Sequence, residues 1–353
     1  MLNPSSYEVE NKIIPITRLT ALWALSESML GGLLHAAHVP LRGMIISSAA
    51  VIIICLIAHF SEKKGEILKA TIIVLIIKGA ISPHTPFAAY LAVFMQGLFG
   101  EIFFYKKRFF AFSSIILGAV IGILTGLQRF VTLTLIFGAT LWDAFNQFMN
   151  YAVNEFLISS SQTNSINFSI ILVSSYVLIH FIFGLAAGTF AAKLPKKIIS
   201  NDAKEMLLSK INLDSAKAIA GKNQGKKKKW WKKPTYLAIL IFSAIHLAIS
   251  YFNPQAINLN QKSILLMLIR SFLIIIIWFF YLSPLLMSFI KKMLHKKQNA
   301  YTNEVSSIIN HIPQYKNITV LIWKSSSKYK GLRRLNHFMT GLIVNVLTLE
   351  ISD

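Results

Sequence analysis

Long apolar segments alternate with short polar segments along the whole chain. A helix needs about 20 apolar residues to cross the hydrocarbon core of a bilayer. Eight segments reach or approach this length: 18–38, 43–60, 67–81, 86–104, 109–127, 168–192, 236–252 and 263–290. The pattern predicts an all-α, polytopic membrane helical bundle with a six-span front half and a two-span back half.

A ninth segment, 131–151, is apolar at its start and polar and aromatic at its end. It fits a partial span, a re-entrant segment or an interfacial helix. Cytoplasmic loops of membrane proteins carry an excess of Lys and Arg. The basic loops of this chain alternate accordingly if the N-terminus is cytoplasmic and 131–151 adds no full crossing. We therefore expect a multi-pass protein of the cell (inner) membrane with both termini in the cytoplasm.

Composition supports a membrane protein. Hydrophobic residues make up 54% of the chain and charged residues only 14%, whereas soluble domains are about 25% charged. This excludes a soluble enzyme, a disordered chain and a coiled coil. The net charge of +22 is expected to mark cytoplasmic loops, and we expect no nucleic acid as a partner. A single cysteine, Cys55, allows neither an internal disulfide nor a cysteine-based metal site.

The densest basic segment divides the chain. Between residues 193 and 233 there are 13 lysines and three acids, with a tryptophan pair at 230–231. Lysines and interfacial tryptophans together favour a cytoplasmic linker that binds anionic lipid. The predicted regions are a six-span membrane domain, a basic linker, a two-span membrane segment and a small cytoplasmic C-terminal region, at 1–197, 198–234, 235–297 and 298–353 respectively.

Small residues recur every four positions in the first span, at Ala24, Ser28, Gly32 and Ala36. This spacing puts them on one ridge of a helix, so that another helix can approach closely. Packing inside the protein and docking on a separate subunit both explain the ridge. Glycines at 118, 122 and 126 have the same spacing and predict a second close approach.

Ionisable residues also lie in the first span, at Glu27, His35 and His38. An ionisable residue at membrane depth is costly and suggests a function. The two histidines lie near the predicted outer end, where an interfacial role, a substrate contact or a zinc site are all open, although no matching ligand cluster supports zinc. In the third span, Lys78 lies near the outer end, where it is expected to extend toward water.

Further polar groups gather on the predicted outer side. His84 lies in a short outer loop, and segment 131–151 carries Trp142, Asp143, Asn146, Gln147 and Asn150. Residues 143, 146, 147 and 150 share one face of a helix. Apolar walls with a few directed polar groups are typical of a small-molecule pocket. The alternative is the ordinary polar outer surface of a membrane protein.

Signatures of catalysis are absent from the sequence. It has no Walker-type phosphate loop, no Gly-x-Ser-x-Gly, no His-Glu-x-x-His and no acidic cluster for a metal. We therefore expect a protein that is not an enzyme by itself and that holds no metal and no cofactor.

The front half, over 14–197, resembles the membrane-embedded substrate-binding S components of energy-coupling factor (ECF) transporters. The likeness rests on six spans with both ends inside, on the small residues of the first span, on the outer polar groups, and on QGLFGEIFF at 96–104 followed by YKKR at 105–108. The back half departs from a lone S component. Its segment 328–338 is faintly similar to a reduced T component, and a lineage-specific extension fits equally well.

In that family, the S component captures a vitamin or similar micronutrient, and its first helix docks on a T component, a scaffold coupled to two ATPases. The resemblance implies docking for the small-residue ridge of the first span and capture for the outer polar groups. It therefore implies a small-molecule substrate and ECF-type scaffold and ATPase subunits as partners. Two other functions stay open. One is an assembly protein that recruits a cytoplasmic partner through its basic tail, and the other is a membrane enzyme that uses Glu27, His35 and His38.

Overall fold

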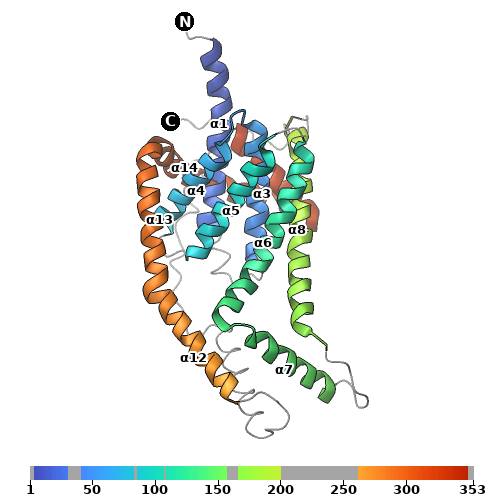
Figure 1. The fold of residues 1–353 in the computed structure, drawn as a ribbon. Coiled ribbons are helices and arrows are strands. Elements are labelled where there is room, and N and C mark those ends of the chain that lie inside the picture. The colour runs from blue at the N-terminus through green and yellow to red at the C-terminus, as the bar shows by residue number, and fades with distance from the viewer. Residues whose placement is uncertain are drawn as a thin grey trace. The chain divides into compact units, whose positions relative to one another are not determined.

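The computed structural model describes residues 4–30, 41–82, 86–106, 109–156, 166–199 and 261–348, and each secondary-structure element in these ranges is a helix (Figure 1). The predicted all-α class is therefore confirmed for the described part of the chain. The longer elements are α1 (Pro4–Leu25), α3 (Arg42–Phe60), α4 (Glu66–Ile81), α5 (Phe87–Phe104), α6 (Phe110–Phe137), α7 (Thr140–Phe156), α8 (Phe168–Ile199), α12 (Gln261–Ile277), α13 (Ser283–Gln298), α14 (Thr302–Ser325) and α15 (Gly331–Thr348). The shorter ones are the π-helices η1 (Ser26–Leu30) and η3 (Trp278–Leu282) and the 3₁₀-helices η4 (Asn299–Tyr301) and η5 (Ser326–Lys328).

Several helices could cross a membrane. By length and composition, the described residues hold five candidates, namely α3, α5, α6, the stretch Phe168–Ile198 of α8, and the stretch Ser271–Lys328. The first four match predicted spans, whereas the fifth overlaps the predicted span 263–290 and extends to residue 328. The predicted span 236–252 lies outside the described residues, and α4, with 16 residues, is shorter than the usual spanning length. The number of crossings and the side of each terminus stay predictions.

The helices form two compact units. Unit 1 comprises Met1–Arg129, Tyr176–Ile211 and Trp278–Asp353, and unit 2 comprises Phe130–Ser175 and Asn212–Ile277. Helices α6 and α8 contribute residues to both units. In particular, helices of the predicted C-terminal region, 298–353, belong to the same unit as the first helix.

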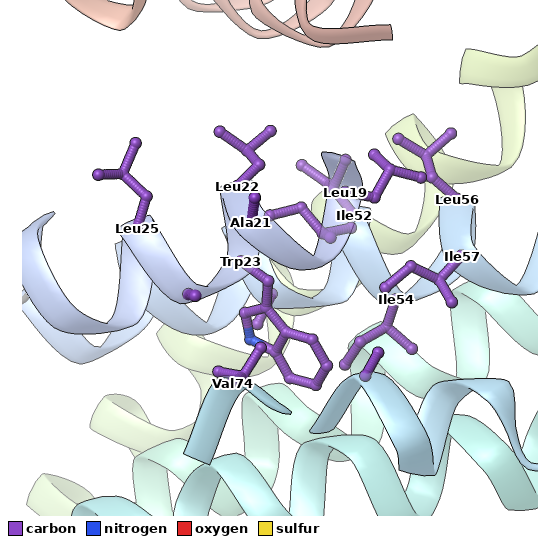
Figure 2. Close-up of a cluster of buried hydrophobic side chains, with 14 of the residues drawn as sticks. Leu19, Ala21, Leu22, Trp23, Leu25, Ile52, Ile54, Leu56, Ile57 and Val74 are labelled. Carbon is purple, nitrogen blue, oxygen red and sulfur yellow. The ribbon is translucent and has the colours of Figure 1, made fainter. Parts of the chain in front are cut away.

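Helix α1 is the centre of unit 1. Every residue from 19 to 28 is buried, and α1 packs against α3, α4, α14 and α15. Figure 2 shows the two sides of this helix: Trp23 points toward Val74 of α4, whereas Leu22 and Leu25 point away from it. A helix that is apolar on all sides must be covered on all sides.

The C-terminal helices supply part of this cover. Apolar residues of α14 recur at helical spacing and are buried, at Val305, Ile308, Ile312, Tyr315, Ile318 and Ile322. On α1, the Arg18 guanidinium donates a hydrogen bond of 2.7 Å from Nη1 to the carbonyl oxygen of Leu347, near the end of α15. A cation at a helix C-terminus complements the partial negative charge of its last carbonyls. The predicted C-terminal region is thus largely helical over its described residues, and α14 and α15 pack against α1.

The start of α4 is fixed by a side chain from α5. Gly65, with φ of 87°, turns the chain into α4 in a conformation that favours glycine. The carboxylate of Glu101 accepts hydrogen bonds from the backbone N–H groups of Gly65 at 2.6 Å and Leu68 at 3.4 Å. These are donors that the first turn of a helix leaves without a partner, so Glu101 caps α4 and joins it to α5.

Helices α6 and α8 approach each other through glycines. A Cβ atom at Gly118 would collide with the backbone carbonyl of Gly184, and one at Gly122 would collide with the carbonyl of His180. At Gly126 a Cβ atom would make a tight contact with Val177, 3.1 Å from its Cα atom. The close approach predicted from the spacing of these three glycines is confirmed, and its partner surface on α8 contains two further glycines, Gly184 and Gly188.

Substituting one of these glycines tests the packing. We expect Gly118→Ala to lower the free energy of unfolding by about 1–3 kcal/mol, because the new methyl group meets backbone rather than a movable side chain. Gly79→Ala in α4 is the matched control, since its Cβ would make only an ordinary contact, at 3.5 Å from the Tyr90 hydroxyl. Thermal unfolding of the detergent-solubilised protein measures both. Equal midpoints for the two variants would contradict the close approach.

Candidate functional site

A buried ion pair joins the first helix region to α4. The Lys78 Nζ atom lies 2.7 Å from Glu27 Oε2, and the two side chains are only 6% and 5% exposed. Lys78 Nζ also lies 3.5 Å from the backbone carbonyl oxygen of Glu27. The expectation that Lys78 extends outward toward water is wrong, because the Glu27 carboxylate holds its ammonium group inside unit 1.

Several buried polar atoms of unit 1 have no hydrogen-bond partner among the residues that the structure describes. In the α1–η1 region they are Trp23 Nε1, Glu27 Oε1 and Ser28 Oγ, and on α5 there is Gln96 Oε1. Buried polar groups without a partner are rare in native proteins, and each one calls for an explanation such as a strained site, a bound water or a ligand. Two of the groups are acceptors, one is a donor, and the Ser28 hydroxyl can do either.

The backbone is irregular at the same place. The α-helical part of the first span ends at Leu25, and Ser26–Leu30 continues as a π-helix. The Ser26 hydroxyl donates to the carbonyl oxygen of Trp23 at 2.8 Å. Single π-turns inside helices occur frequently at functional sites. Thus the start of the irregular turn, the carboxylate of the buried ion pair and three polar atoms without a described partner all lie within residues 23–28.

The other residues predicted in or near the first span divide into two groups. His35, His38, Gly32 and Ala36 lie outside the described residues, and so does His84. Ala24 and Ser28 are described, and both are buried within unit 1, at 0% and 6% exposed. This half of the small-residue ridge therefore packs inside the chain itself.

The predicted polar face on 131–151 belongs to unit 2. The segment is divided between the end of α6 and α7, because Gly138, with φ of 73°, ends α6 there. The start of α7, the end of α6 and the start of α8 enclose a groove of about 570 Å³. Its polar lining includes Trp142, Asp143 and Asn146, whereas the exposed Gln147 is not part of the lining.

Three of these α7 residues bond to the start of α8. Asn146 Oδ1 accepts from the backbone N–H of Ser169 at 2.7 Å, and the carbonyl oxygen of Trp142 accepts from the Ser169 hydroxyl at 3.0 Å. Asn150 donates from Nδ2 to the carbonyl oxygen of Ile166 at 2.9 Å and accepts at Oδ1 from its N–H at 3.1 Å. The side chains of Asn146 and Asn150 thus hold α7 to the chain before and at α8. Asp143 is exposed in the groove, and its role as a ligand contact stays a prediction.

Pairing Glu27 with Lys78 was the feature that sequence reasoning missed. The available signal was an acidic residue inside the first predicted span and a lysine near the end of the third, which have opposite charges. Gln96 gave a similar signal as a buried amide in the fourth predicted span. For metals, the described residues hold no group of three or more His, Cys, Asp or Glu side chains that could bind an ion together.

Breaking the ion pair on one side should destabilise the protein strongly. We expect Glu27→Met or Lys78→Met to cost about 3–5 kcal/mol, because either change leaves the other charge buried and uncompensated. The double variant Glu27→Met/Lys78→Met should recover most of that loss. Thermal unfolding in detergent measures all three.

A second ion pair on α4 gives the control. Lys69 Nζ lies 3.1 Å from Glu304 Oε1, but these side chains are 39% and 36% exposed. Substituting either partner by Met should cost at most about 1 kcal/mol. If the single variants at Glu27 and Lys78 were no less stable than these controls, the buried pair would contribute no more to the free energy of unfolding than an exposed one.

The chain was also compared with known proteins. No family model, curated protein or solved structure matches it. The likeness to S components therefore rests on the sequence features given above.

Proposed function

We propose that this protein is the membrane-embedded capture subunit of an importer for a vitamin or similar micronutrient. It binds one small molecule at the outer face and passes it inward with the help of separate ATPase subunits. The observation that carries this proposal is the buried Glu27–Lys78 pair, together with the polar atoms of residues 23–28 that have no partner among the described residues. No catalytic role is assigned to these residues.

The chemistry of this region suits capture. A binding site for a small molecule is mostly apolar and has a few directed polar groups that fix orientation and specificity. Glu27 Oε1 and Ser28 Oγ are such groups, and Trp23 adds an aromatic ring whose N–H donor has no acceptor among the described residues. Lys78 neutralises the charge of Glu27, so a bound molecule need not supply an opposite charge to enter an apolar bundle.

The predicted topology adds a route from outside. Helix η1 ends at Leu30 and α4 ends at Ile81, and both lead toward the predicted outer loops that carry His35, His38 and His84. A ligand that reaches the pair would therefore arrive from the outer side. These histidines are proposed as its contacts near the entrance.

The same resemblance implies docking through the first helix. In the described part of that helix, Ala24 and Ser28 are already buried by the chain: η1, which carries Ser28, packs against α3 and α4, and α1 also packs against α14 and α15. We infer that these two C-terminal helices act as a built-in portion of the scaffold. The outer half of the ridge, at Gly32 and Ala36, is left for a separate scaffold subunit.

A thermal-shift screen of the detergent-solubilised protein tests capture directly. The compounds are water-soluble vitamins, their precursors and common metal ions. A ligand that binds only the folded state adds about 4 kcal/mol of stability at a thousandfold excess over its dissociation constant. We expect one vitamin-like compound to raise the unfolding temperature strongly.

The double variant then locates the site. We expect Glu27→Met/Lys78→Met to fold but to lose the shift with that compound, whereas Lys69→Met/Glu304→Met keeps it. A shift that survives in the first variant would move binding away from the pair, and Asp143→Asn and Trp142→Ala would then test the groove of unit 2. A shift with zinc alone would favour the membrane enzyme, and no shift with any compound would favour the assembly protein.

A further inference from the structure

One corner of unit 1 exposes cations and large apolar side chains together. It lies where α14 turns into α15, and we call it the tail corner. Its residues are Trp323, Lys324, Lys328, Tyr329, Lys330, Leu332, Arg333, Arg334 and Leu335. Leu332 is 84% exposed and Leu335 is 51% exposed, although both lie on a regular helix. Exposed leucines on an ordered helix indicate a surface that is covered by something other than water.

The tail corner has a fixed shape. The Arg334 guanidinium lies over the Trp323 ring, 4.2 Å from its centre, and Trp323 meets Phe338 edge to face at 5.1 Å. Tyr329 stacks on His337 at 4.5 Å. These contacts link the end of α14 to the first turns of α15, so the cations and leucines are presented on one ordered surface.

The charge of this surface is uncompensated in the sequence around it. No Asp or Glu occurs between Glu304 and Glu350, and five Lys or Arg residues lie between 324 and 334. A long stretch with cations alone attracts an anionic partner. The interleaved Trp, Tyr and Leu residues show that the partner also has an apolar side.

A hydrogen bond to α8 places the tail corner beside the end of a helix that could span a membrane. Lys197, in the last turn of α8, donates from Nζ to Asn336 Oδ1 at 3.3 Å. Basic residues at the end of a spanning helix lie at the membrane–water boundary. Asn336 follows Leu335 directly, so the exposed turns of α15 lie at the same boundary if α8 spans the bilayer.

We propose that the tail corner binds the anionic lipid headgroups of the bilayer in which the protein is embedded. Lys328, Lys330 and Arg333 contact the phosphates, and Leu332 and Leu335 enter the boundary of the acyl chains. Basic residues with Leu and Trp beside them are the composition of helices that lie in the membrane interface. A lipid partner fits better than a nucleic acid, because a nucleic acid would leave the leucines exposed to water.

Quenching by brominated lipids tests this contact, because bromine on an acyl chain quenches a nearby tryptophan. The full chain is placed in bilayers of phosphatidylcholine mixed with phosphatidylglycerol, with one or the other lipid brominated. The protein has six tryptophans, so the signal of Trp323 is the difference between the wild type and Trp323→Phe. We expect Trp323 to be quenched more by brominated phosphatidylglycerol than by brominated phosphatidylcholine.

Two triple variants show whether the lipid preference comes from the cations of the tail corner or from the net charge of the protein. In Lys328→Gln/Lys330→Gln/Arg333→Gln, the preference for phosphatidylglycerol should fall by about fivefold for each cation removed. The control Lys63→Gln/Lys106→Gln/Lys316→Gln removes the same charge from other exposed positions and should keep the preference.

Three results would overturn the proposal. If neither lipid quenches Trp323, the tail corner faces water or an acidic protein partner instead. If both lipids quench it equally, the contact is apolar without selection for the anionic headgroup. If the control loses the preference as much as the first variant, the effect follows net charge and no site exists at this corner.

Discussion

Complete burial of one helix segment is the constraint on which the rest of unit 1 depends. Residues 19–28 have no exposed side, so water does not reach their polar groups, and each such group that finds no partner within the protein is costly to bury. The hydroxyl groups of Thr20 and Ser26 find partners within the same helical segment, because they donate to the backbone carbonyls of Ile16 and Trp23, both at 2.8 Å. Glu27 cannot, because a carboxylate requires a cation at this depth. Lys78 of α4 is that cation, and the pair joins α4 to η1, which also packs against α3.

The same constraint explains why the C-terminal helices belong with the first. Helices α3 and α4 cover part of α1, and α14 and α15 cover another part. α14 is amphipathic and gains its stability by burying its apolar face, since an isolated helix of this kind is marginal in water. The front half and the tail are therefore mutually dependent: removing α14 and α15 would expose part of α1, and removing α1 would leave their apolar faces without cover.

Sequence patterns predicted where the helices lie better than they predicted which side chains pair between helices. Runs of apolar residues indicated α3, α5, α6 and α8, and four-residue spacing indicated the glycine contact between α6 and α8. Both signals are local and periodic, which is why they can be read from one chain. The pairing of Glu27 with Lys78 joins residues 51 positions apart, and no local pattern encodes such a distance. The hydrogen bond that Asn146 accepts from Ser169 could not be predicted for the same reason, since it depends on how α7 packs against α8.

The two polar regions differ in what their hydrogen-bonding groups already do. On α7, Asn146 and Asn150 bond to the backbone of 166–169, so a ligand that engaged them would first have to replace those bonds. Beside α1, Glu27 Oε1 and Ser28 Oγ are buried and have no partner within the described part of the chain. A buried polar group left unpaired costs about 1–3 kcal/mol, and a molecule that bonds to it recovers that cost on binding. Affinity for a small polar molecule is therefore obtained more readily at the Glu27–Lys78 pair than at the polar face of α7.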